Sequence, residues 1–382
     1  MSKKKWTIYG AIATAVVIAG FAVPVLADEP SYDELVARLD AAEARIAEMS
    51  EAPASELDIA RAKATKQLVR DVLADADTRT MMQGNGNPVT VNVHGFVQSR
   101  YTYSGGGNDE AQHGFSVPRA RLILSGDVYD WEYKVSGQWT EGGDFSLMDA
   151  YAQGGLLSGT FRVGQFKAPF MREVLVSQQD TLMAERSIVS NMFGQGRSQG
   201  VQWSRDFGML DFSGAFTDGF DTANGAGVQN GQAFTGRATV DVLDWWNVGA
   251  AVSWNDLVDT SYTTYTFDTK VSTGGLDLTA AYVATTGDAG DNWGTTVQAG
   301  YMCMENFQGF VAYEYGELEG VEENLSVFTV GGNYWFNDNV KWTTDFGYAL
   351  NGINGAWDLG ETGWNAGDSG EYIVRTQLQI QF

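Results

Sequence analysis

The spacing of hydrophobic residues changes once along the chain, from helical to strand-like. In the first part, apolar residues between Ser31 and Met49 recur in steps of four and three, which is the heptad spacing of a coiled-coil helix. A second helical run is expected from Ser55, a suitable N-cap, to about Arg79. We therefore predict a helical, coiled-coil segment, and the alternative is an amphipathic helix packed on its own domain. The apolar heptad positions are Leu35, Leu39, Ala42, Ile46 and Met49.

From Thr90 to the C-terminus, apolar and polar residues alternate with the period of two that is typical of β-strands. In the first segment, Val93 and Val97 fall on one face, and Gln98 and Arg100 fall on the other. Sixteen such segments are expected, and most have about ten residues, the length that a tilted strand needs to cross a bilayer. They start near Thr90, Phe115, Trp131, Leu147, Thr160, Gln199, Met209, Phe234, Asn247, Tyr262, Leu276, Thr295, Phe307, Leu325, Val340 and Tyr372.

The connections between these segments alternate between short and long. Short turns such as 206–208 alternate with long loops such as 104–112, 167–196 and 351–369. Short turns at one end and long loops at the other are typical of outer-membrane barrels. A soluble β-sandwich would also alternate, but the number of strands and the aromatic residues at their ends favour a barrel.

The N-terminus predicts that the chain is exported. Residues 1–27 have the features of a signal peptide: three lysines, an apolar core, and small residues before Asp28. The predicted fold is therefore an all-β transmembrane barrel of about 16 antiparallel strands over 84–382. An α-helical (coiled-coil) segment over 28–83 precedes it, and we expect this segment in the periplasm, on the side of the short turns.

The composition argues against several other classes of protein. Asp and Glu number 48 against 24 Lys and Arg, whereas a nucleic-acid binder needs clustered positive charge, so no nucleic acid is expected as a partner. The single cysteine, Cys303, excludes an internal disulfide and a cysteine metal cluster. The two histidines, His94 and His113, do not lie beside a recognisable nucleophile motif. We therefore expect no enzymatic activity, no metal and no cofactor.

The long loop 167–196 is the most informative connection. It follows a strand that Pro169 ends, because proline has no N–H to give to a ladder. The loop carries many apolar residues together with Lys167, Arg172 and Arg186. Loops of this length in compact domains are usually functional or disordered. We predict that this one folds into a pore, and the alternative is a short amphipathic helix on the surface.

Basic residues concentrate in the first half of the predicted barrel, around this loop. By the alternation of faces, Arg100, Arg119, Arg121 and Arg162 point into the lumen. Acidic residues point there too, so opposite charges that pair across neighbouring strands and support the wall are an equal alternative to a solute path. The candidate pore or constriction residues are Arg162, Lys167, Arg172, Arg186, Arg100, Arg119 and Arg121.

The segment RVGQFKAPF, at 162–170, resembles the entry into the third loop of the phosphate-selective porin O and P family. The last strand, which alternates up to a terminal Phe382, resembles the C-terminal strand of bacterial outer-membrane proteins. The family resemblance implies a homotrimer of water-filled barrels whose third loop narrows each pore. It also implies a constriction lined by arginines and a lysine, and Arg162 and Lys167 stand at the matching segment.

The resemblance and the residues together predict an outer-membrane porin for passive diffusion of small hydrophilic solutes and ions. Its partners would be outer-membrane lipid, two further copies of itself, and small ions or phosphate-like anions as solutes. Four basic against three acidic residues in the loop region predict a weak anion or phosphate preference. The alternative is a structural outer-membrane anchor with a periplasmic coiled-coil tether.

Overall fold

The computed structural model describes residues 89–382, apart from 107–108, 221, 226–230, 258–259, 361, 366 and 368. The predicted signal peptide and the predicted coiled-coil segment lie outside the described residues. Within the described part, the helices are too short and too polar to cross a membrane.

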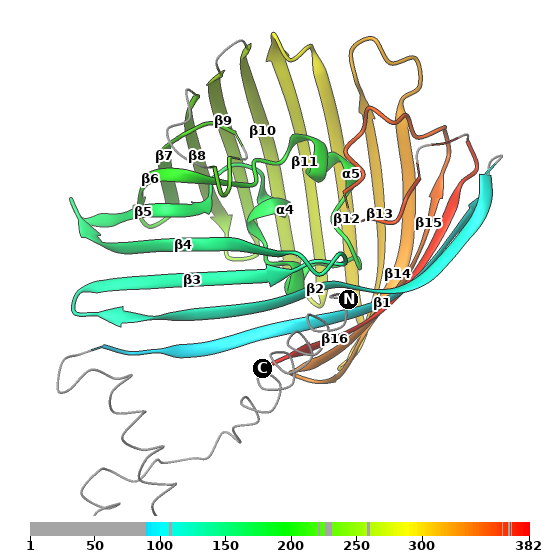
Figure 1. Cartoon of the computed structure of the whole chain (residues 1–382), viewed down its shortest axis with the longest axis horizontal. Coiled ribbons are helices and arrows are strands. Elements are labelled where there is room, and N and C mark those ends of the chain that lie inside the picture. Colours follow the sequence, from blue (N-terminus) through cyan, green and yellow to red (C-terminus); the bar gives the residue numbers. More distant parts are fainter. Residues whose placement is uncertain are drawn as a thin grey trace, which may run out of the picture. The chain divides into compact units, whose positions relative to one another are not determined.

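Sixteen antiparallel strands close into one barrel, in which each strand pairs with its neighbours in sequence and β1 pairs with β16 (Figure 1). The predicted barrel fold is confirmed. The strands are β1 (Asn92–Gly106), β2 (Asp109–Val128), β3 (Trp131–Trp139), β4 (Phe145–Leu156), β5 (Gly159–Lys167), β6 (Arg197–Asp206), β7 (Leu210–Thr217), β8 (Gln232–Leu243), β9 (Trp246–Leu257), β10 (Thr260–Thr273), β11 (Leu276–Gly287), β12 (Asn292–Met304), β13 (Phe307–Glu317), β14 (Leu325–Asn337), β15 (Val340–Ala349) and β16 (Tyr372–Gln381).

The two ends of the sheet meet through a continuous ladder. Gln98 of β1 lies opposite Gln379 of β16, and Arg100 lies opposite Gln377. At the C-terminus, the N–H of Phe382 donates to the Gly95 carbonyl at 3.0 Å, and the Gly95 N–H donates back at 2.8 Å. Closure leaves no free sheet edge, so the backbone of the wall is satisfied without help from solvent.

The two faces of the wall differ as expected for a barrel in lipid. Phe267 of β10 is 58% exposed on the outside, whereas its neighbours Thr266 and Asp268 are buried on the inside. The same alternation buries Arg100 and Gln98 inside β1. Apolar side chains therefore face outward and polar or charged side chains face the lumen, which is the reverse of a soluble core.

One predicted connection is wrong. The segment 104–112 was expected to be a loop, but it continues the β1–β2 ladder, with Ser104 opposite Gln112 and Gly106 opposite Asp109. The segment is rich in glycine and polar residues and lacks the alternation of a lipid-facing strand. Backbone pairing does not need that alternation, so the hairpin extends beyond it, and Gly106 takes a positive φ of 95° at the turn.

Two connections fill part of the lumen. Residues 168–196 leave β5 and carry α4 (Arg172–Leu175), the 3₁₀ turn η1 (Gln178–Asp180) and α5 (Ile188–Phe193) before β6 begins. Figure 1 shows α4 and α5 within the ring of strands. Residues 350–371, between β15 and β16, pack against α5 from the same side of the barrel.

Gly164, in the middle of β5, provides a test of the wall. It has a φ of 128°, and a Cβ there would lie 2.2 Å from the Ala150 carbonyl oxygen of β4. We expect Gly164→Ala to lower the free energy of unfolding by roughly 1–3 kcal/mol from backbone strain alone. The matched control is Gly155→Ala, because a Cβ at Gly155 meets no atom within 4 Å. Thermal unfolding followed by heat-modified gel mobility measures both, and equal stability of the two variants would contradict this account.

Candidate functional site

The loop 168–196 is braced by Lys167, the last residue of β5, and by its own Arg186. The Lys167 side-chain nitrogen donates to the carbonyls of Val174 and Val176, at 2.5 and 3.1 Å. Arg186 donates to the same end of α4, at 2.5 Å to Val176 and 3.1 Å to the Glu173 carbonyl. Cations at the carbonyl end of a helix satisfy acceptors that have no partner within the helix.

The other end of the loop is held by a carboxylate. Glu173 accepts from the backbone N–H of Ser187 at 2.9 Å and from its hydroxyl at 2.8 Å. It also accepts from the Ser190 hydroxyl at 2.6 Å. Since Ser187 caps the N-terminus of α5, Glu173 joins α4 to α5 and gives the loop a fixed shape.

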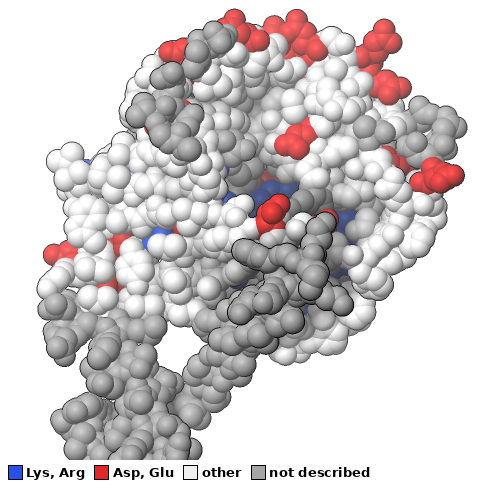
Figure 2. Space-filling model, in the orientation of Figure 1, with Lys and Arg blue, Asp and Glu red and all other residues white. Residues whose placement is uncertain are grey.

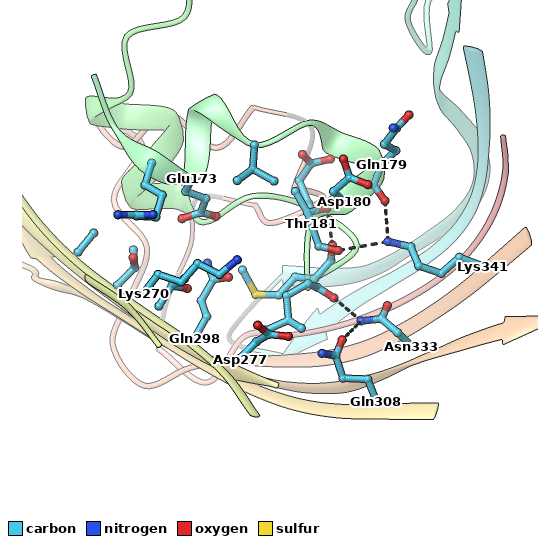
Figure 3. A pocket seen from close by; sticks show the side chains of 18 of the residues that line it. Glu173, Gln179, Asp180, Thr181, Lys270, Asp277, Gln298, Gln308, Asn333 and Lys341 are labelled. Atoms are coloured by element: carbon cyan, nitrogen blue, oxygen red, sulfur yellow. Dashed lines mark hydrogen bonds between the residues drawn. The ribbon is translucent and has the colours of Figure 1, made fainter. Parts of the chain in front are cut away.

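Lumen-facing side chains from distant strands hold this loop from several directions. Arg172 forms an ion pair with Asp268 of β10 at 2.6 Å and a hydrogen bond with Asn247 of β9. On the opposite side, Lys341 of β15 donates to the Gln179 carbonyl at 2.8 Å, and Asn333 of β14 donates to the Leu182 carbonyl at 2.9 Å (Figure 3). The loop therefore lies across the lumen, with its backbone satisfied by the wall.

Glu185 makes a buried contact between the loop and the wall. Its carboxylate accepts from Arg100 of β1 at 2.9 Å and from Arg119 of β2 at 2.8 Å. Gln178 adds a third donor at 2.7 Å. Burial alone would raise the pKa of Glu185, but the two guanidinium groups hold it well below the usual range of a carboxyl group.

The neighbouring Arg186 keeps its charge in a different environment. Burial, together with the charges of Arg119 and Arg197, lowers the pKa of Arg186 to about 10, although Glu185 and Glu173 oppose the shift. Its guanidinium group donates hydrogen bonds to the neutral carbonyls of Glu173 and Val176. Arg186 is thus a protonated cation at neutral pH whose charge is not cancelled by a direct ion pair among the described residues.

An apolar cluster occupies the part of the lumen nearest the long loops. Ile188, Val189 and Phe193 of α5 pack with Trp357 and Trp364 from 350–371. The rings of Phe193 and Trp357 lie 6.1 Å apart at their centroids. This cluster behaves as a small hydrophobic core inside the barrel, so it excludes water from that part of the cross-section and fixes α5 against the wall.

The seven predicted pore residues fall into two groups by their partners. Arg100 and Arg119 share the carboxylate of Glu185, and Arg172 forms an ion pair with Asp268. The other four donate to neutral oxygens. Arg121 donates to the amide oxygen of Gln138, and Arg162 donates to that of Gln153. Lys167 and Arg186 donate to backbone carbonyls of the loop. Among the described residues, no carboxylate forms an ion pair with any of these four side chains. We call the three guanidinium groups among them, those of Arg121, Arg162 and Arg186, the uncompensated cations.

The sequence did not single out several contacts of the same loop. Lys341, Asp345 and Arg375 on β15 and β16 come together at its middle, where the Ala184 N–H donates to Asp345 at 3.0 Å. The alternation of faces places all three in the lumen, but it gives no sign that they meet a loop that lies more than 150 residues earlier. The sequence did not single out Arg197 either. It forms an ion pair with Asp149 at 2.8 Å, and Lys134 lies 3.4 Å from the same carboxylate.

Two cavities adjoin the loop. A cavity of about 580 Å³ lies between the loop and strands β10 to β15, and Asp180, Lys270 and Asp277 face it (Figure 3). A smaller cavity of about 220 Å³ is lined by Arg162, Lys167 and Arg237. Figure 2 shows Lys and Arg in the depth of the hollow and Asp and Glu along its edge. Within the described residues, no group of three His, Cys, Asp or Glu could hold a metal ion.

A closed barrel of sixteen strands with a loop folded into a polar lumen defines the porin class of membrane channel. The chain belongs to the phosphate-selective porin O and P family, whose model matches residues 89–304. The matched span includes β1 to β12 and the whole inward-folded loop. The protein is therefore a porin of the outer membrane, a channel for passive diffusion of small solutes, and the alternative of a mere anchor is not favoured.

Solved porins share this fold at low sequence identity. An anion-selective porin from Comamonas acidovorans aligns with a TM-score of 0.57 and 12% identity, over 77% of this chain and 100% of that one. OmpF of Salmonella typhi, in complex with daunomycin, aligns with a TM-score of 0.62 and 14% identity, over 78% and 98%. The trimer form of OmpT from Vibrio cholerae aligns with a TM-score of 0.55 and 12% identity, over 77% and 99%. The comparison with curated protein sequences gave no match.

Glu185 provides a test of how the loop is held. We expect Glu185→Gln to destabilise the folded barrel by about 3–5 kcal/mol, because it leaves Arg100 and Arg119 buried without their counter-charge. It should also broaden the distribution of single-channel conductance as the loop loosens. The matched control is Glu322→Gln, an exposed residue between β13 and β14. A Glu185→Gln channel with the stability and noise of the control would show that the contact does not hold the loop.

The ion pairs of Glu185 with Arg100 and Arg119 predict that stability depends on pH. The pKa of Glu185 is lower in the folded state than in the unfolded state, so its stabilising effect is full above the unfolded value of about 4.5. The effect is lost as pH falls through the lower, folded value. The stability difference between wild type and Glu185→Gln should thus be constant from pH 8 to about 5 and shrink only in more acidic solution. Melting temperatures measured across this range check the prediction.

Proposed function

We propose that this porin has a weak preference for anions, set by the uncompensated cations at the inward-folded loop. The observation that carries this proposal is that the guanidinium groups of Arg121, Arg162 and Arg186 donate to neutral oxygens and form no ion pair with a carboxylate among the described residues. Charges that face a narrow, partly dehydrated passage act at close range and weigh heavily on ion choice.

The overall charge of −24 does not oppose this proposal. Many acidic residues, such as Glu319, Glu322 and Glu323, are exposed in connections between strands. Salt screens such charges within about 8 Å at physiological ionic strength. Their effect is to moderate the preference by attracting cations to the mouth of the channel.

The pairing of charges also limits the strength of the preference. Asp149, Asp268 and Glu185 each take two cations, and Asp345 takes one. Most basic side chains of the lumen therefore support the wall and the loop instead of a solute. Lys167 itself is engaged by carbonyls of α4, so a tight phosphate site built on it is not expected. Phosphate-like anions would then pass through the channel in the same way as other small solutes.

For the rest of the protein, we propose a homotrimer with residues 28–83 as a periplasmic helical segment behind a signal peptide over 1–27. The heptad positions from Leu35 to Met49 support a bundle of three such segments. The barrel contacts would form the main interface, as closed symmetry allows each copy to use the same two surfaces.

The selectivity proposal is tested by the double variant Arg121→Gln and Arg162→Gln in planar bilayers. We expect the reversal potential under a salt gradient to move toward the cation equilibrium potential, because two lumen charges are lost. The matched control is Arg205→Gln, since Arg205 lies opposite the outward-facing Phe212 and lines neither loop cavity. A wild-type channel that strongly prefers cations, or one that micromolar phosphate blocks, would refute the proposal.

The assembly proposal is tested by Leu39→Asp combined with Ile46→Asp. Charges at two heptad positions should weaken the helical bundle while the barrels remain folded. Native gels and cross-linking of residues 28–83 measure the change, and Arg38→Glu, at a position outside the apolar seam, is the control. Purely monomeric wild-type protein in mild detergent would refute the trimer.

A further inference from the structure

One guanidinium group in the lumen is held in place without using its terminal donors. Arg162 of β5 donates from Nε to the amide oxygen of Gln153 on β4 at 2.9 Å. The amide nitrogen of Gln153 donates in turn to Glu132 of β3 at 2.6 Å, which keeps the amide oxygen toward Arg162. Within the part of the chain that the structure describes, Nη1 and Nη2 of Arg162 form no hydrogen bond. This pair of nitrogens is a fork of donors that is open to a solute.

Aromatic rings limit the movement of the same guanidinium group. Cζ of Arg162 lies 4.4 Å from the centre of the Tyr151 ring and 5.7 Å from that of Phe166. Gly164 lies opposite Tyr151 in the β4–β5 ladder and separates Arg162 from Phe166 along β5. Because Gly164 has no side chain, it leaves room for the Tyr151 ring beside Arg162. A cation beside an aromatic face is attracted to it, so the ring and Gln153 together hold the fork in one orientation.

The fork lines the smaller of the two cavities beside the loop, between the loop and strands β5 to β8. Its volume is about 220 Å³. A water molecule takes up about 30 Å³ in the liquid, so the cavity has room for a small organic solute. Pro169 and Leu175 of the loop give the cavity an apolar side. The wall supplies amide and hydroxyl groups from Gln202, Ser213 and Thr239.

Two side chains of this cavity have acceptor oxygens without a donor among the described residues. Gln202 lies opposite Arg162 in the β5–β6 ladder and is 8% exposed, and its Oε1 accepts no hydrogen bond there. Asp211, near the short-turn end of β7, is exposed and also lines the cavity. No donor to its carboxylate is found in the described part of the chain. Hydroxyl groups of a solute are suitable donors for both oxygens.

The other basic side chains of the cavity are occupied by the protein. The Lys167 side-chain nitrogen donates to backbone carbonyls of α4. Arg237 donates to a loop carbonyl from Nη1 and to Asp268 from Nη2. Among the three basic side chains of the cavity, Arg162 alone keeps both terminal nitrogens open. One fork matches the two oxygens of a carboxylate, whereas a phosphate has further oxygens that would be left without donors.

We propose that this cavity binds one small monocarboxylate that carries hydroxyl groups, such as a uronate or an aldonate, on its way through the channel. The inference rests on the proposed anion preference and names a class of solute that the preference serves. The carboxylate accepts two hydrogen bonds from Arg162. The carbon skeleton lies against Pro169 and Leu175. The hydroxyl groups donate to Gln202 and Asp211, and the charge of Asp211 disfavours a second carboxylate at that end.

The first test uses the wild-type, full-length channel in planar bilayers and measures how organic solutes block its chloride current. D-glucuronate should block at a lower concentration than butyrate, which lacks hydroxyl groups, and than glucose, which lacks the charge. It should also block at a lower concentration than inorganic phosphate, because a single fork leaves phosphate oxygens without donors. Glucuronate that blocks no better than butyrate or phosphate would overturn the proposal.

The second test asks whether Arg162 acts through its fork or only through its charge. Arg162→Lys keeps the charge but loses the fork, so it should raise the half-blocking concentration of glucuronate about tenfold and that of phosphate much less. The matched control is Arg205→Lys, since Arg205 lies opposite the outward-facing Phe212 and does not line this cavity. An equal change for glucuronate and phosphate, or no change for either, would contradict a carboxylate site at Arg162.

Tyr151 is a positioning residue in this account, and a pair of variants tests that role. Tyr151→Leu removes the aromatic face and should raise the half-blocking concentration of glucuronate about threefold. Tyr151→Phe keeps the ring and should bind glucuronate as wild type does. Heat-modified gel mobility shows whether both barrels are folded. Equal block of the two variants by glucuronate would show that the ring does not hold Arg162.

The reversal potential of the wild-type channel separates this inference from the proposed function. A channel without anion preference refutes the proposed function and, with it, the basis of this site. A channel with anion preference that glucuronate does not block refutes the carboxylate site alone.

Discussion

The loop inside the barrel depends on the buried carboxylate of Glu185 and the two arginines that hold it. Arg100 and Arg119 come from the first two strands, and Glu185 comes from a loop that begins after the fifth. A buried ion with such a partner is costly to separate, so the contact fixes where the loop lies in the lumen. Asp345, Asn333 and Lys341 hold the neighbouring segment 179–184 against their strands by further hydrogen bonds.

A loop that crosses the interior of a barrel of this size needs hydrogen-bond partners for its backbone. A wall with apolar residues outside must have polar residues inside, yet a loop that crosses the interior brings backbone groups that need partners. Here the wall side chains supply those partners, and the cluster of α5 with Trp357 and Trp364 supplies local apolar packing. The interior thus contains a small hydrophobic core, and the rest of the lumen, which is lined by polar and charged side chains, is available to solutes.

Basic side chains in the lumen have two kinds of environment: some form ion pairs with carboxylates, and others bind neutral oxygens. Glu185, Asp149 and Asp268 each gather two cations and thereby build the wall and the loop. Arg121, Arg162 and Arg186 bind neutral oxygens, and in the function that we propose they supply the positive field that acts on a passing ion. Which role an arginine takes depends on the distance to a carboxylate, a property of the folded chain and not of the residue.

The barrel could be predicted from the amino-acid sequence, because every strand repeats the same local pattern. Alternation with a period of two, lengths near ten residues and unequal connections recur sixteen times, and the predicted starts at Trp131, Leu276, Phe307, Leu325, Val340 and Tyr372 coincide with those of the strands. The extended hairpin over 104–112 was not predicted, because its backbone pairs without an alternation of apolar and polar side chains. Which basic side chains form ion pairs with carboxylates could be seen only in the folded chain. Arg119 and Arg121 are two residues apart on one face of β2, yet one meets Glu185 and the other Gln138. That difference depends on where a loop from another part of the chain lies, and no local pattern in the sequence records it.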